Sequence, residues 1–176
     1  MKIYFVRHGQ TAWNAENKVC GVTDLPLTEE GVRQAQKAAQ HLKDKDIDLI
    51  LSSPMTRALQ TAREAAKVCG AAVVTDSRLR EQDFGEYEGV DRHDVRFKNA
   101  KKEFAVRFPK GESIAQVIHR VYSVLDEIRN KYPNKNILIV CHGGVCRAAR
   151  TYFTDMTAQE YANYSPDNAS VTEYEI

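Results

Sequence analysis

Short runs of apolar residues recur along the chain and predict the strands of a sheet. Residues 3–6, Ile-Tyr-Phe-Val, show no polar alternation, which is typical of a strand covered on both faces. Residues 47–51 and 137–140 have the same character, and residues 71–75 and 171–174 are further short β-prone runs. The pattern therefore predicts five short strands, at least three of them buried.

Two helices are predicted in the first half of the chain. Thr28 is a suitable N-cap, and apolar residues at helical spacing follow it to about residue 43. Ser53 is the expected N-cap of the next helix, with Pro54 at its first position. Arg57 then falls in the first turn, where its side chain should lean back toward the end of the preceding strand. The alternative is an exposed Arg57 paired with Glu64 or solvent.

The second half of the chain contains the clearest helical pattern. It opens after Ser113, ends at Tyr132 and carries its apolar residues at helical spacing. A further helix is expected from Val145 to about Phe153. Because strands and helices alternate, the fold class is α/β, with a mostly parallel sheet between helical layers.

Composition and charge narrow the class of protein. The 176 residues are predicted to form one domain, 1–176, with 43% hydrophobic and 28% charged residues. A net charge of +1 gives no reason to expect nucleic acid or a membrane as partner. Four cysteines that lack the dense spacing of a disulfide framework indicate a reducing compartment, and no signal peptide or membrane span is recognisable. We expect a cytoplasmic globular protein.

Arginine and histidine side chains follow three of the predicted strands. Arg7 and His8 follow the first, Arg57 lies just after the second, and His142 follows the fourth. In a parallel sheet these strand ends share one edge, so the four side chains should converge. Arginine matches phosphoryl oxygens bidentately, and neutral histidine is a nucleophile. Close approach of the backbone to a ligand is expected at three glycines, Gly9, Gly143 and Gly144.

Phosphoryl transfer to a histidine also needs an acid that protonates the leaving alkoxide. Glu81 is the preferred candidate, because it follows the third predicted strand. Spacing alone does not exclude four other acids, Glu16, Asp83, Glu86 and Glu88.

Several blocks of sequence, in this order, resemble the histidine phosphatase superfamily, and most closely its branch of phosphoglycerate mutases and related phosphatases. They are R-H-G-Q-T-A-W-N at 7–14, G-V-T-D-L-P-L-T at 21–28, S-S-P-M-T-R-A-L-Q-T-A at 52–62, L-R-E-Q-D-F-G-E-Y-E-G at 79–89 and C-H-G-G-V at 141–145. Cys20 and Cys141 depart from the family pattern, which commonly has an amide at the first position and serine at the second.

The resemblance implies a three-layer α/β/α fold with one antiparallel strand, and no metal or other cofactor. It implies that His8 is the phosphorylated nucleophile, that Glu81 is the proton donor, and that the phosphoryl oxygens are held by Arg7, Arg57 and His142. It also implies a set of substrate-binding residues: Asn14, Cys20, Gly21, Thr23 and Gly143.

The expected activity is hydrolysis of small-molecule phosphomonoesters through a phosphohistidine on His8. The first alternative is a phosphoglycerate mutase. Mutases of this family tend to carry a longer insertion than the short lid expected here over residues 90–111, and a short lid favours water as the acceptor. The second alternative is a non-catalytic phospho-ligand binding domain. The presence of all the expected catalytic residues argues against it. Substrate identity and oligomeric state stay open.

Residues 91–110 carry seven Lys or Arg and His93 against three acids. Such a segment is usually a solvated face. The sharper alternative is a lid that selects anionic substrates through side chains such as Arg92, Arg96 and Lys98.

A second phosphatase chemistry is also compatible with the sequence. Residues 141–147, C-H-G-G-V-C-R, have the C-x₅-R spacing of cysteine-dependent phosphatases. If His142 faces the crevice, however, Cys141 should point to the packed side of the strand. We therefore expect Cys141 to be structural, and thiol reagents to act only through Cys20.

Overall fold

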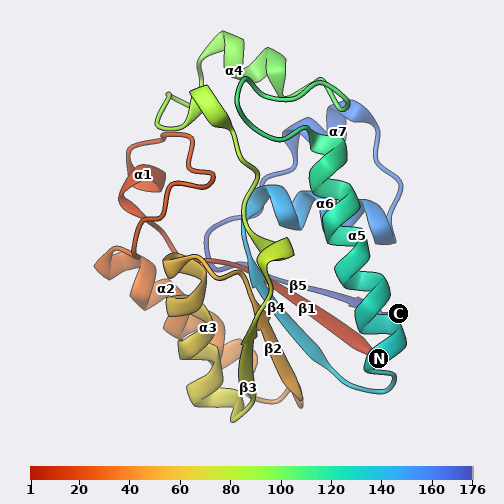
Figure 1. Ribbon diagram of the computed structural model, residues 1–176. Coiled ribbons are helices and arrows are strands. Elements are labelled where there is room, and N and C mark those ends of the chain that lie inside the picture. The colour runs from red at the N-terminus through yellow and green to blue at the C-terminus, as the bar shows by residue number, and fades with distance from the viewer. Residues whose placement is uncertain (176) are drawn as a thin grey trace.

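A five-stranded sheet forms the centre of the protein in the computed structural model, which describes residues 1–175 (Figure 1). Ile176, the last residue of the predicted domain, lies outside the described residues. The strand order is β3-β2-β4-β1-β5, and every neighbouring pair is parallel except β1 and β5, which are antiparallel. The strands are β1 (Lys2–Arg7), β2 (Leu49–Ser52), β3 (Ala72–Thr75), β4 (Ile137–Cys141) and β5 (Val171–Glu175).

Helices cover both faces of this sheet (Figure 1). On one face lie α2 (Glu29–His41) and α3 (Thr56–Cys69), and on the other lie α5 (Ile114–Lys131) and α6 (Gly143–Phe153). The expected three-layer α/β/α fold with a single antiparallel strand is thereby confirmed.

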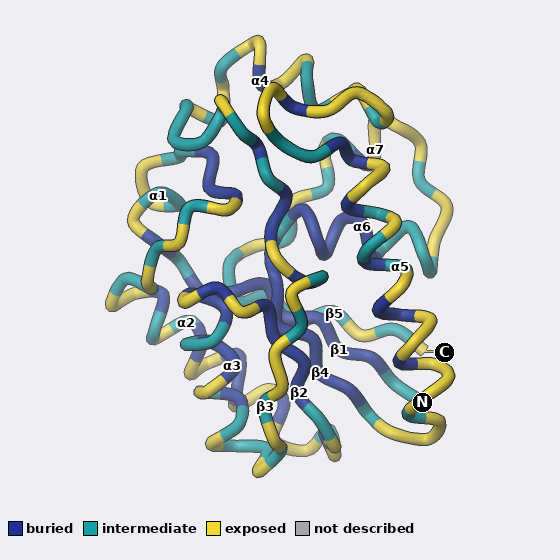
Figure 2. Tube along the Cα trace, viewed as in Figure 1, coloured by how far each residue is buried: buried dark blue, intermediate teal, exposed yellow. Residues whose placement is uncertain are grey.

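Each face of the sheet has its own hydrophobic core, and the side chains along β1 alternate between the two. Ile3 and Phe5 point to the side of α5 and α6, whereas Tyr4 and Val6 point to the side of α2 and α3. All four side chains are at most 2% exposed. Figure 2 shows β1 and β4 buried along most of their length at the centre of the molecule. The apolar run in the sequence is therefore a strand covered on both faces, as expected.

Shorter elements gather beyond the carboxyl ends of the strands (Figure 1). They are the helices α1 (Ala12–Ala15), α4 (Val95–Ala100) and α7 (Ala158–Asn163), and the 3₁₀ turns η1 (Ser77–Leu79) and η2 (Gly85–Tyr87). Helix α1 lies in a stretch that the sequence pattern leaves irregular, and a capping box at Thr11 stabilises this single turn. Helix α7 was not expected.

The second predicted helix starts later than expected. Helix α3 begins at Thr56, and its N-cap, Met55, has no side-chain capping bond. Ser53 does not cap it: its Oγ accepts from the backbone N–H of Met55 at 3.3 Å, in the turn before the helix, and also contacts His142 Nε2 at 2.8 Å. Asp24, from the loop before α2, takes over by accepting bonds from the backbone N–H and hydroxyl of Thr56 at 2.9 and 2.8 Å. The expected capping of α2 by Thr28 is confirmed, and Ser113, where the second-half helix was expected to open, caps α5 through a capping box.

The basic segment, residues 91–110, is more than a solvated face. Phe97 and Phe108 point inward and pack with Phe84 and Val19 in a small core of their own. Phe84 meets each of the two phenylalanines edge to face, with ring centroids 5.5 and 5.3 Å apart. This aromatic cluster fixes α4 above the carboxyl ends of the strands.

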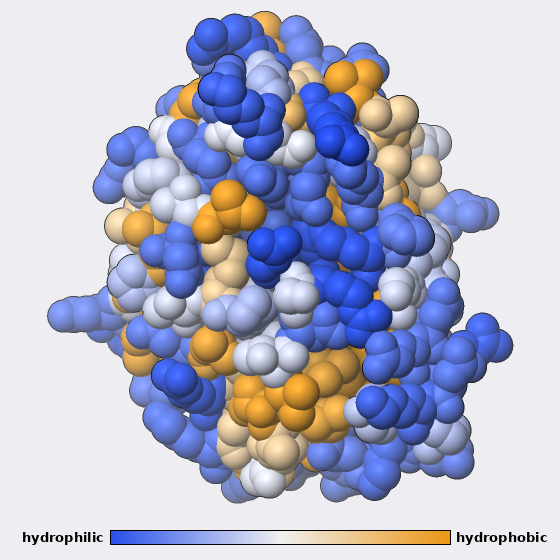
Figure 3. Space-filling model, viewed as in Figure 1, coloured by the Kyte–Doolittle hydropathy of each residue, from blue (hydrophilic) through white to orange (hydrophobic). Residues whose placement is uncertain are grey.

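The outer surface is mostly hydrophilic on the face that Figure 3 shows, with one apolar area low on that face. A hollow near the edge of the sheet is lined by both charged and apolar side chains, including Leu51, Val74 and Ile128, and Val74 on edge strand β3 is 49% exposed. Among the helices of residues 1–175, none combines the length and apolar character that crossing a bilayer requires.

Candidate active site

The two histidines come together because their strands are parallel neighbours. Arg7 and Cys141 are paired in the β1–β4 register, so His8 and His142 leave the sheet side by side. The backbone N–H of His8 donates to the carbonyl of Cys141 at 2.9 Å, and the two imidazole centroids are 5.0 Å apart. Both side chains are buried. The expected convergence at one edge of the sheet is confirmed.

Arg57 joins the two histidines and is fully buried. Its Nε–H is shared between His8 Nε2 and His142 Nδ1, each 3.2 Å away. The other two nitrogens donate to the backbone carbonyls of Thr23 and Gly21 at 2.9 and 2.6 Å. The guanidinium therefore points back to the strand ends, as expected, and the exposed alternative is wrong.

These contacts assign the tautomers of both imidazoles. His8 Nδ1–H donates to the Gly9 carbonyl at 2.7 Å, which leaves the lone pair on Nε2. His142 accepts from Arg57 at Nδ1, so its Nε2–H donates to the hydroxyl of Ser53 at 2.8 Å.

The surroundings of both imidazoles also lower their pKa values. Burial and the charges of Arg57 and Arg7 hold the pKa of His8 well below 6.5. Burial and the charge of Arg57 lower the pKa of His142 in the same direction. His8 is therefore a neutral imidazole at neutral pH.

These lowered pKa values predict a specific pH dependence. Neither His8 nor His142 should titrate between pH 7.5 and 5.5 in the folded protein, whereas both bind protons near pH 6.5 when unfolded. The unfolded state then binds more protons below pH 6.5, so the free energy of unfolding should fall as pH falls, by up to about 1.4 kcal/mol per pH unit for each histidine. NMR titration of the ring protons, with His8→Gln for assignment, measures this directly. A His8 midpoint near 6.5 would contradict it.

The guanidinium of Arg7 has one N–H group that forms no hydrogen bond within residues 1–175. Its Nη1 bonds the Pro166 carbonyl, but its buried Nε has no hydrogen-bond partner among the described residues. Burial lowers the pKa of Arg7 to about 10, so it stays charged at neutral pH. A Cβ placed on Gly143 would lie 3.7 Å from this Nε and 3.9 Å from Glu81 Oε2. Gly143 thus lies between the free donor and the candidate acid.

The five candidate acids are separated by their positions. Glu81 is buried, and its two oxygens accept backbone N–H bonds from Gln82 at 2.8 Å and Gly144 at 3.0 Å. Gly144 leaves room for this contact, because a Cβ there would lie 2.4 Å from Glu81 Oε1 and would displace the carboxylate. Of the five, only Glu81 lines the cavity beside Arg7 and Gly143.

The other four acids have structural or surface contacts. Glu16 and Glu86 form ion pairs with lysines, and Asp83 accepts from the N–H of Gly85. Glu88 accepts bonds from the backbone N–H groups of residues 21–23 and thereby fixes the loop that receives Arg57.

A cavity of about 90 Å³ adjoins these groups. Arg7, Glu81, Gly143 and Gly144 line it, together with Cys20 from the loop after α1. His8, Arg57 and His142 lie outside this lining and are at most 3% exposed. The cavity is therefore placed to receive the part of a ligand that extends away from the imidazoles.

The remaining predicted substrate residues are positioned differently. Asn14 Oδ1 accepts from the N–H of Thr11 and from Asn168 Nδ2, so this amide is used inside the protein. Gly21 and Thr23 present their carbonyls to Arg57. Contact of Asn14, Gly21 and Thr23 with a substrate stays a prediction. Gly9 is required for packing against α2, because a Cβ there would lie 2.2 Å from the carbonyl oxygen of Gly31. Close approach of its backbone to a ligand stays a prediction.

A segment that the sequence analysis left out completes the site. Asn168 Nδ2 donates to the His8 carbonyl at 3.0 Å, and the N–H of Ala169 donates to the carbonyl of Arg7 at 2.9 Å. Because β5 runs antiparallel to β1, its first residues lie beside the end of β1. Ser-Pro-Asp-Asn at 165–168 is a turn signal, and this signal before an antiparallel strand could have located the segment.

The cysteines of the C-x₅-R match are packed away from this chemistry. Cys141 belongs to the core, and its Sγ lies 3.5 Å from Cys146 Sγ. Burial raises the pKa of Cys141 well above the usual thiol value, so the thiol is neutral. The expected packing of Cys141 is confirmed, and Cys20 is the cysteine that lines the cavity.

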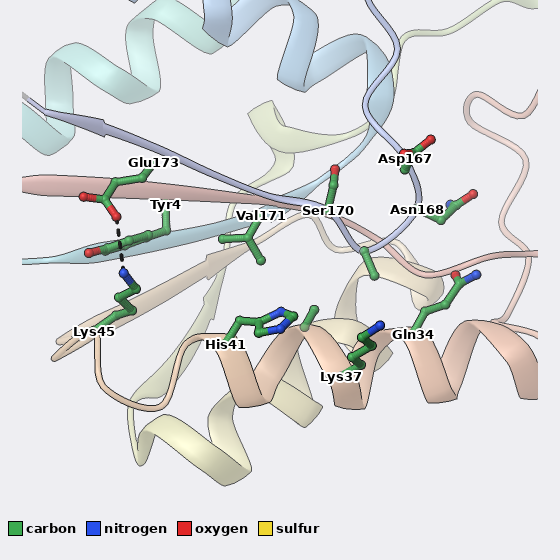
Figure 4. A pocket seen from close by; sticks show the side chains of 12 residues that line it. Tyr4, Gln34, Lys37, His41, Lys45, Asp167, Asn168, Ser170, Val171 and Glu173 are labelled. Atoms are coloured by element: carbon green, nitrogen blue, oxygen red, sulfur yellow. Dashed lines mark ion pairs between the residues drawn. The ribbon is translucent and has the colours of Figure 1, made fainter.

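A larger groove of about 670 Å³ lies elsewhere, between α2 and β5 (Figure 4). Its lining mixes charges of both signs, including Lys37, Lys45 and Glu173, and Lys45 pairs with Glu173 at 3.6 Å. None of the convergent Arg and His side chains lines it. Within residues 1–175, no three His, Cys, Asp or Glu side chains gather as a metal site would require. Metal-independent chemistry stays a prediction.

Comparison with known proteins assigns the family. The family model of the histidine phosphatase superfamily (branch 1) matches residues 3–176. The chain belongs to this superfamily. A curated relative described as a probable phosphoglycerate mutase GpmB, from Yersinia pestis (strain Pestoides F), is 37% identical over 150 residues, which cover 81% of this chain and 70% of the relative.

Solved structures share the fold over almost the whole chain. Mycobacterial glucosyl-3-phosphoglycerate phosphatase, solved with VO₃, is 30% identical with a TM-score of 0.87, covering 98% of this chain and 91% of that one. The phosphoserine phosphatase of Entamoeba histolytica, solved with 3-phosphoglyceric acid, is 29% identical with a TM-score of 0.85, covering 98% and 89%. Similar proteins thus include both phosphatases and a probable mutase.

Proposed function

We propose that this protein hydrolyses small-molecule phosphomonoesters through a phosphohistidine on His8. The observation that carries the proposal is the fixed, neutral imidazole of His8. Its Nδ1–H is held by the Gly9 carbonyl, its Nε2 lone pair faces the buried Arg57, and the charge of the buried Arg7 lies near enough to lower its pKa. A buried neutral imidazole beside guanidiniums is suited to attack a phosphoryl group, whose negative oxygens the guanidiniums neutralise.

In the first step, His8 Nε2 attacks phosphorus in line with the ester oxygen. The N–P bond forms as the P–O bond breaks, and the proton of Glu81 passes to the leaving alkoxide. Arg57 Nε–H, which holds Nε2 in the resting site, transfers its hydrogen bond to a phosphoryl oxygen. The free Nε–H of Arg7 supplies a second donor.

In the second step, ionised Glu81 takes a proton from water, and the resulting hydroxide attacks the phosphohistidine. The P–N bond breaks, inorganic phosphate leaves, and His8 returns to its neutral form. Gly144 keeps the carboxylate in place for both steps through its N–H bond to Oε2. No metal or cofactor takes part in this scheme.

The second candidate function is a phosphoglycerate mutase, because curated relatives carry that description. A mutase would use the same His8 chemistry but return the phosphoryl group to a hydroxyl of glycerate. A merely binding function has less support, since all five of the proposed catalytic groups are present and assembled.

One assay separates the two activities. We expect phosphate release from a panel containing 3-phosphoglycerate, phosphoserine, glucosyl-3-phosphoglycerate and p-nitrophenyl phosphate, without interconversion of 2- and 3-phosphoglycerate. Release is measured colorimetrically, and interconversion by ³¹P NMR with 2,3-bisphosphoglycerate present as primer. Interconversion that is faster than phosphate release would overturn the hydrolase proposal in favour of the mutase.

A further inference from the structure

The segment that carries the proposed acid is held by a single arginine of α5, Arg120. Residues 76–83 lead from β3 to the loops beyond the carboxyl ends of the strands (Figure 1). Nη1 of Arg120 donates to the backbone carbonyls of Arg78 and Arg80, and Nη2 donates to the carbonyl of Glu81 at 3.1 Å. One guanidinium therefore fixes three carbonyls within residues 78–81.

A carboxylate holds Arg120 in turn. Glu112 directly follows residues 90–111, and its Oε1 and Oε2 accept from Nε and Nη2 of Arg120, both at 3.1 Å. This bidentate pair is mostly shielded from solvent, because the two side chains are 13% and 24% exposed. Glu112 Oε2 also accepts from the N–H of Asp83 at 3.0 Å, and the Glu112 N–H donates to the Asp83 carbonyl at 2.9 Å. The backbone is thus bonded on both sides of Glu81.

Glu81 turns its side chain to the site and its carbonyl to Arg120. The carboxylate accepts from the N–H groups of Gln82 and Gly144, whereas the carbonyl accepts from Arg120. Arg120 is not among the residues that line the cavity. An effect of Arg120 on the reaction is therefore expected to pass through the position of Glu81.

The backbone of this segment depends on such contacts. Residues 80–84 belong to no helix or strand, so neither a helical ladder nor a sheet ladder fixes their peptide groups. Displacing a catalytic group by about 1 Å can cost about 100-fold in rate. A guanidinium that holds the backbone of Glu81 can therefore decide how well its carboxyl group is placed.

The simpler explanation is that Arg120 only fastens the segment to α5 and so contributes to stability. Arg78 provides the comparison. Its side chain pairs with Asp76 and Glu127 at 2.6 and 2.7 Å and bonds the Ser123 hydroxyl, so it also ties this segment to α5. Among the hydrogen bonds within residues 1–175, however, none joins the Arg78 side chain to residues 80–83.

We propose that Arg120, held by Glu112, is a positioning residue for the proposed acid, and that it fixes the backbone of Glu81 so that the carboxyl group stays in place beside Gly144. The inference rests on the proposed function, because Glu81 acts as acid and base only in that scheme. Arg120 contacts neither the phosphoryl group nor the leaving group, so its contribution should appear only in steps that use Glu81.

Two esters test this expectation. Arg120→Lys keeps the charge, but a single ammonium cannot reach three carbonyls and Glu112 at once. We expect its kcat/KM for glycerol 3-phosphate to fall about 10- to 100-fold, and that for p-nitrophenyl phosphate less than about 3-fold. Arg78→Gln is the matched control. It should lower the midpoint of thermal unfolding and change the ratio of the two kcat/KM values by less than about 3-fold.

A second background separates positioning from stability. Added to Glu81→Gln, Arg120→Lys should lower kcat/KM for glycerol 3-phosphate by less than about 3-fold, because the position of residue 81 no longer matters once its acid is gone. The full loss in this background would overturn the proposal. Glu112→Gln keeps one oxygen for Arg120 and should show the same leaving-group dependence with a smaller loss, so it carries the same tests if Arg120→Lys does not fold.

NMR follows the carboxylate without turnover. The N–H of Gly144, which donates to Glu81 Oε2, should shift in a ¹⁵N–¹H spectrum of Arg120→Lys in the same direction as in Glu81→Gln, and stay in place in Arg78→Gln. If Glu81→Gln shows the leaving-group dependence and Arg120→Lys does not, the positioning role is overturned and the hydrolase proposal stands. If neither shows it, the acid role of Glu81 fails, and the Gly144 signal alone decides: a shift supports positioning by Arg120, and an unchanged signal overturns it.

Discussion

His8→Ala should abolish turnover of every phosphomonoester, with a loss of at least about 10⁴-fold in kcat, because the variant has no group that can accept the phosphoryl group. The fold should survive. Arg57 keeps its bonds to His142 and to the carbonyls of Thr23 and Gly21 when the His8 imidazole is removed. Circular dichroism and thermal unfolding check the fold, and phosphate release checks the activity.

Cys141→Ser is the matched control for this loss, because Cys141 is the other candidate nucleophile and lies at the end of β4, where its carbonyl accepts from the N–H of His8. It should keep most of the activity, since the buried neutral thiol packs against Cys146 in the core and does not line the cavity. A folded and active His8→Ala, or a folded and inactive Cys141→Ser, would contradict the assignment of the nucleophile.

Glu81→Gln should have the second largest effect, and the effect should depend on the leaving group. For alkyl esters such as glycerol 3-phosphate we expect a loss of about 10²- to 10⁴-fold in kcat/KM, because the alkoxide leaves without a proton donor. For p-nitrophenyl phosphate the loss in kcat/KM should be below about 10-fold, since that phenolate needs little protonation. Its breakdown should instead show a burst, because the second step still lacks its base.

Two further variants sharpen this result. Gly144→Ala places a Cβ 2.4 Å from Glu81 Oε1 and should displace the carboxylate, so it should reproduce the same leaving-group dependence with the acid still present. Glu86→Gln, whose native side chain pairs with Lys110 on the surface, should leave all rates unchanged. Equal losses of Glu81→Gln on alkyl and aryl esters would remove Glu81 from the acid role.

The sheet and the convergent cations could be predicted because they depend on local signals. Runs of apolar residues predicted β1 and β4. Because parallel strands end at the same edge of a sheet, the polar residues directly after them were expected to lie close together. Arg57 followed from its place in the first turn of α3. The start of that helix was placed too early, because Ser53 Oγ accepts from the N–H of Met55 in a turn before the helix. It also contacts His142, over 89 residues, which no local pattern shows.

The parts that escaped prediction depend on long-range packing. The turn at Pro166 and Asn168 reaches the site only because β5 is antiparallel to β1. In the basic segment, charge counts could not distinguish Lys101, which faces the cavity, from Arg96, which faces solvent. Likewise, five nearby acids could be separated only by their contacts, since Glu81 alone reaches the cavity.

Trapping the covalent intermediate tests the central claim most directly. The protein is mixed with a ³²P-labelled aryl phosphate, quenched in base, digested and mapped, and ¹⁵N-labelled protein is examined by NMR to identify the phosphorylated nitrogen. The account predicts one acid-labile, base-stable phosphoryl group on Nε2 of His8, because Nδ1 is engaged by the Gly9 carbonyl, and none in His8→Ala. A phosphoryl group on His142 or on a cysteine, or rapid phosphate release with none trapped in wild type or Glu81→Gln, would contradict it.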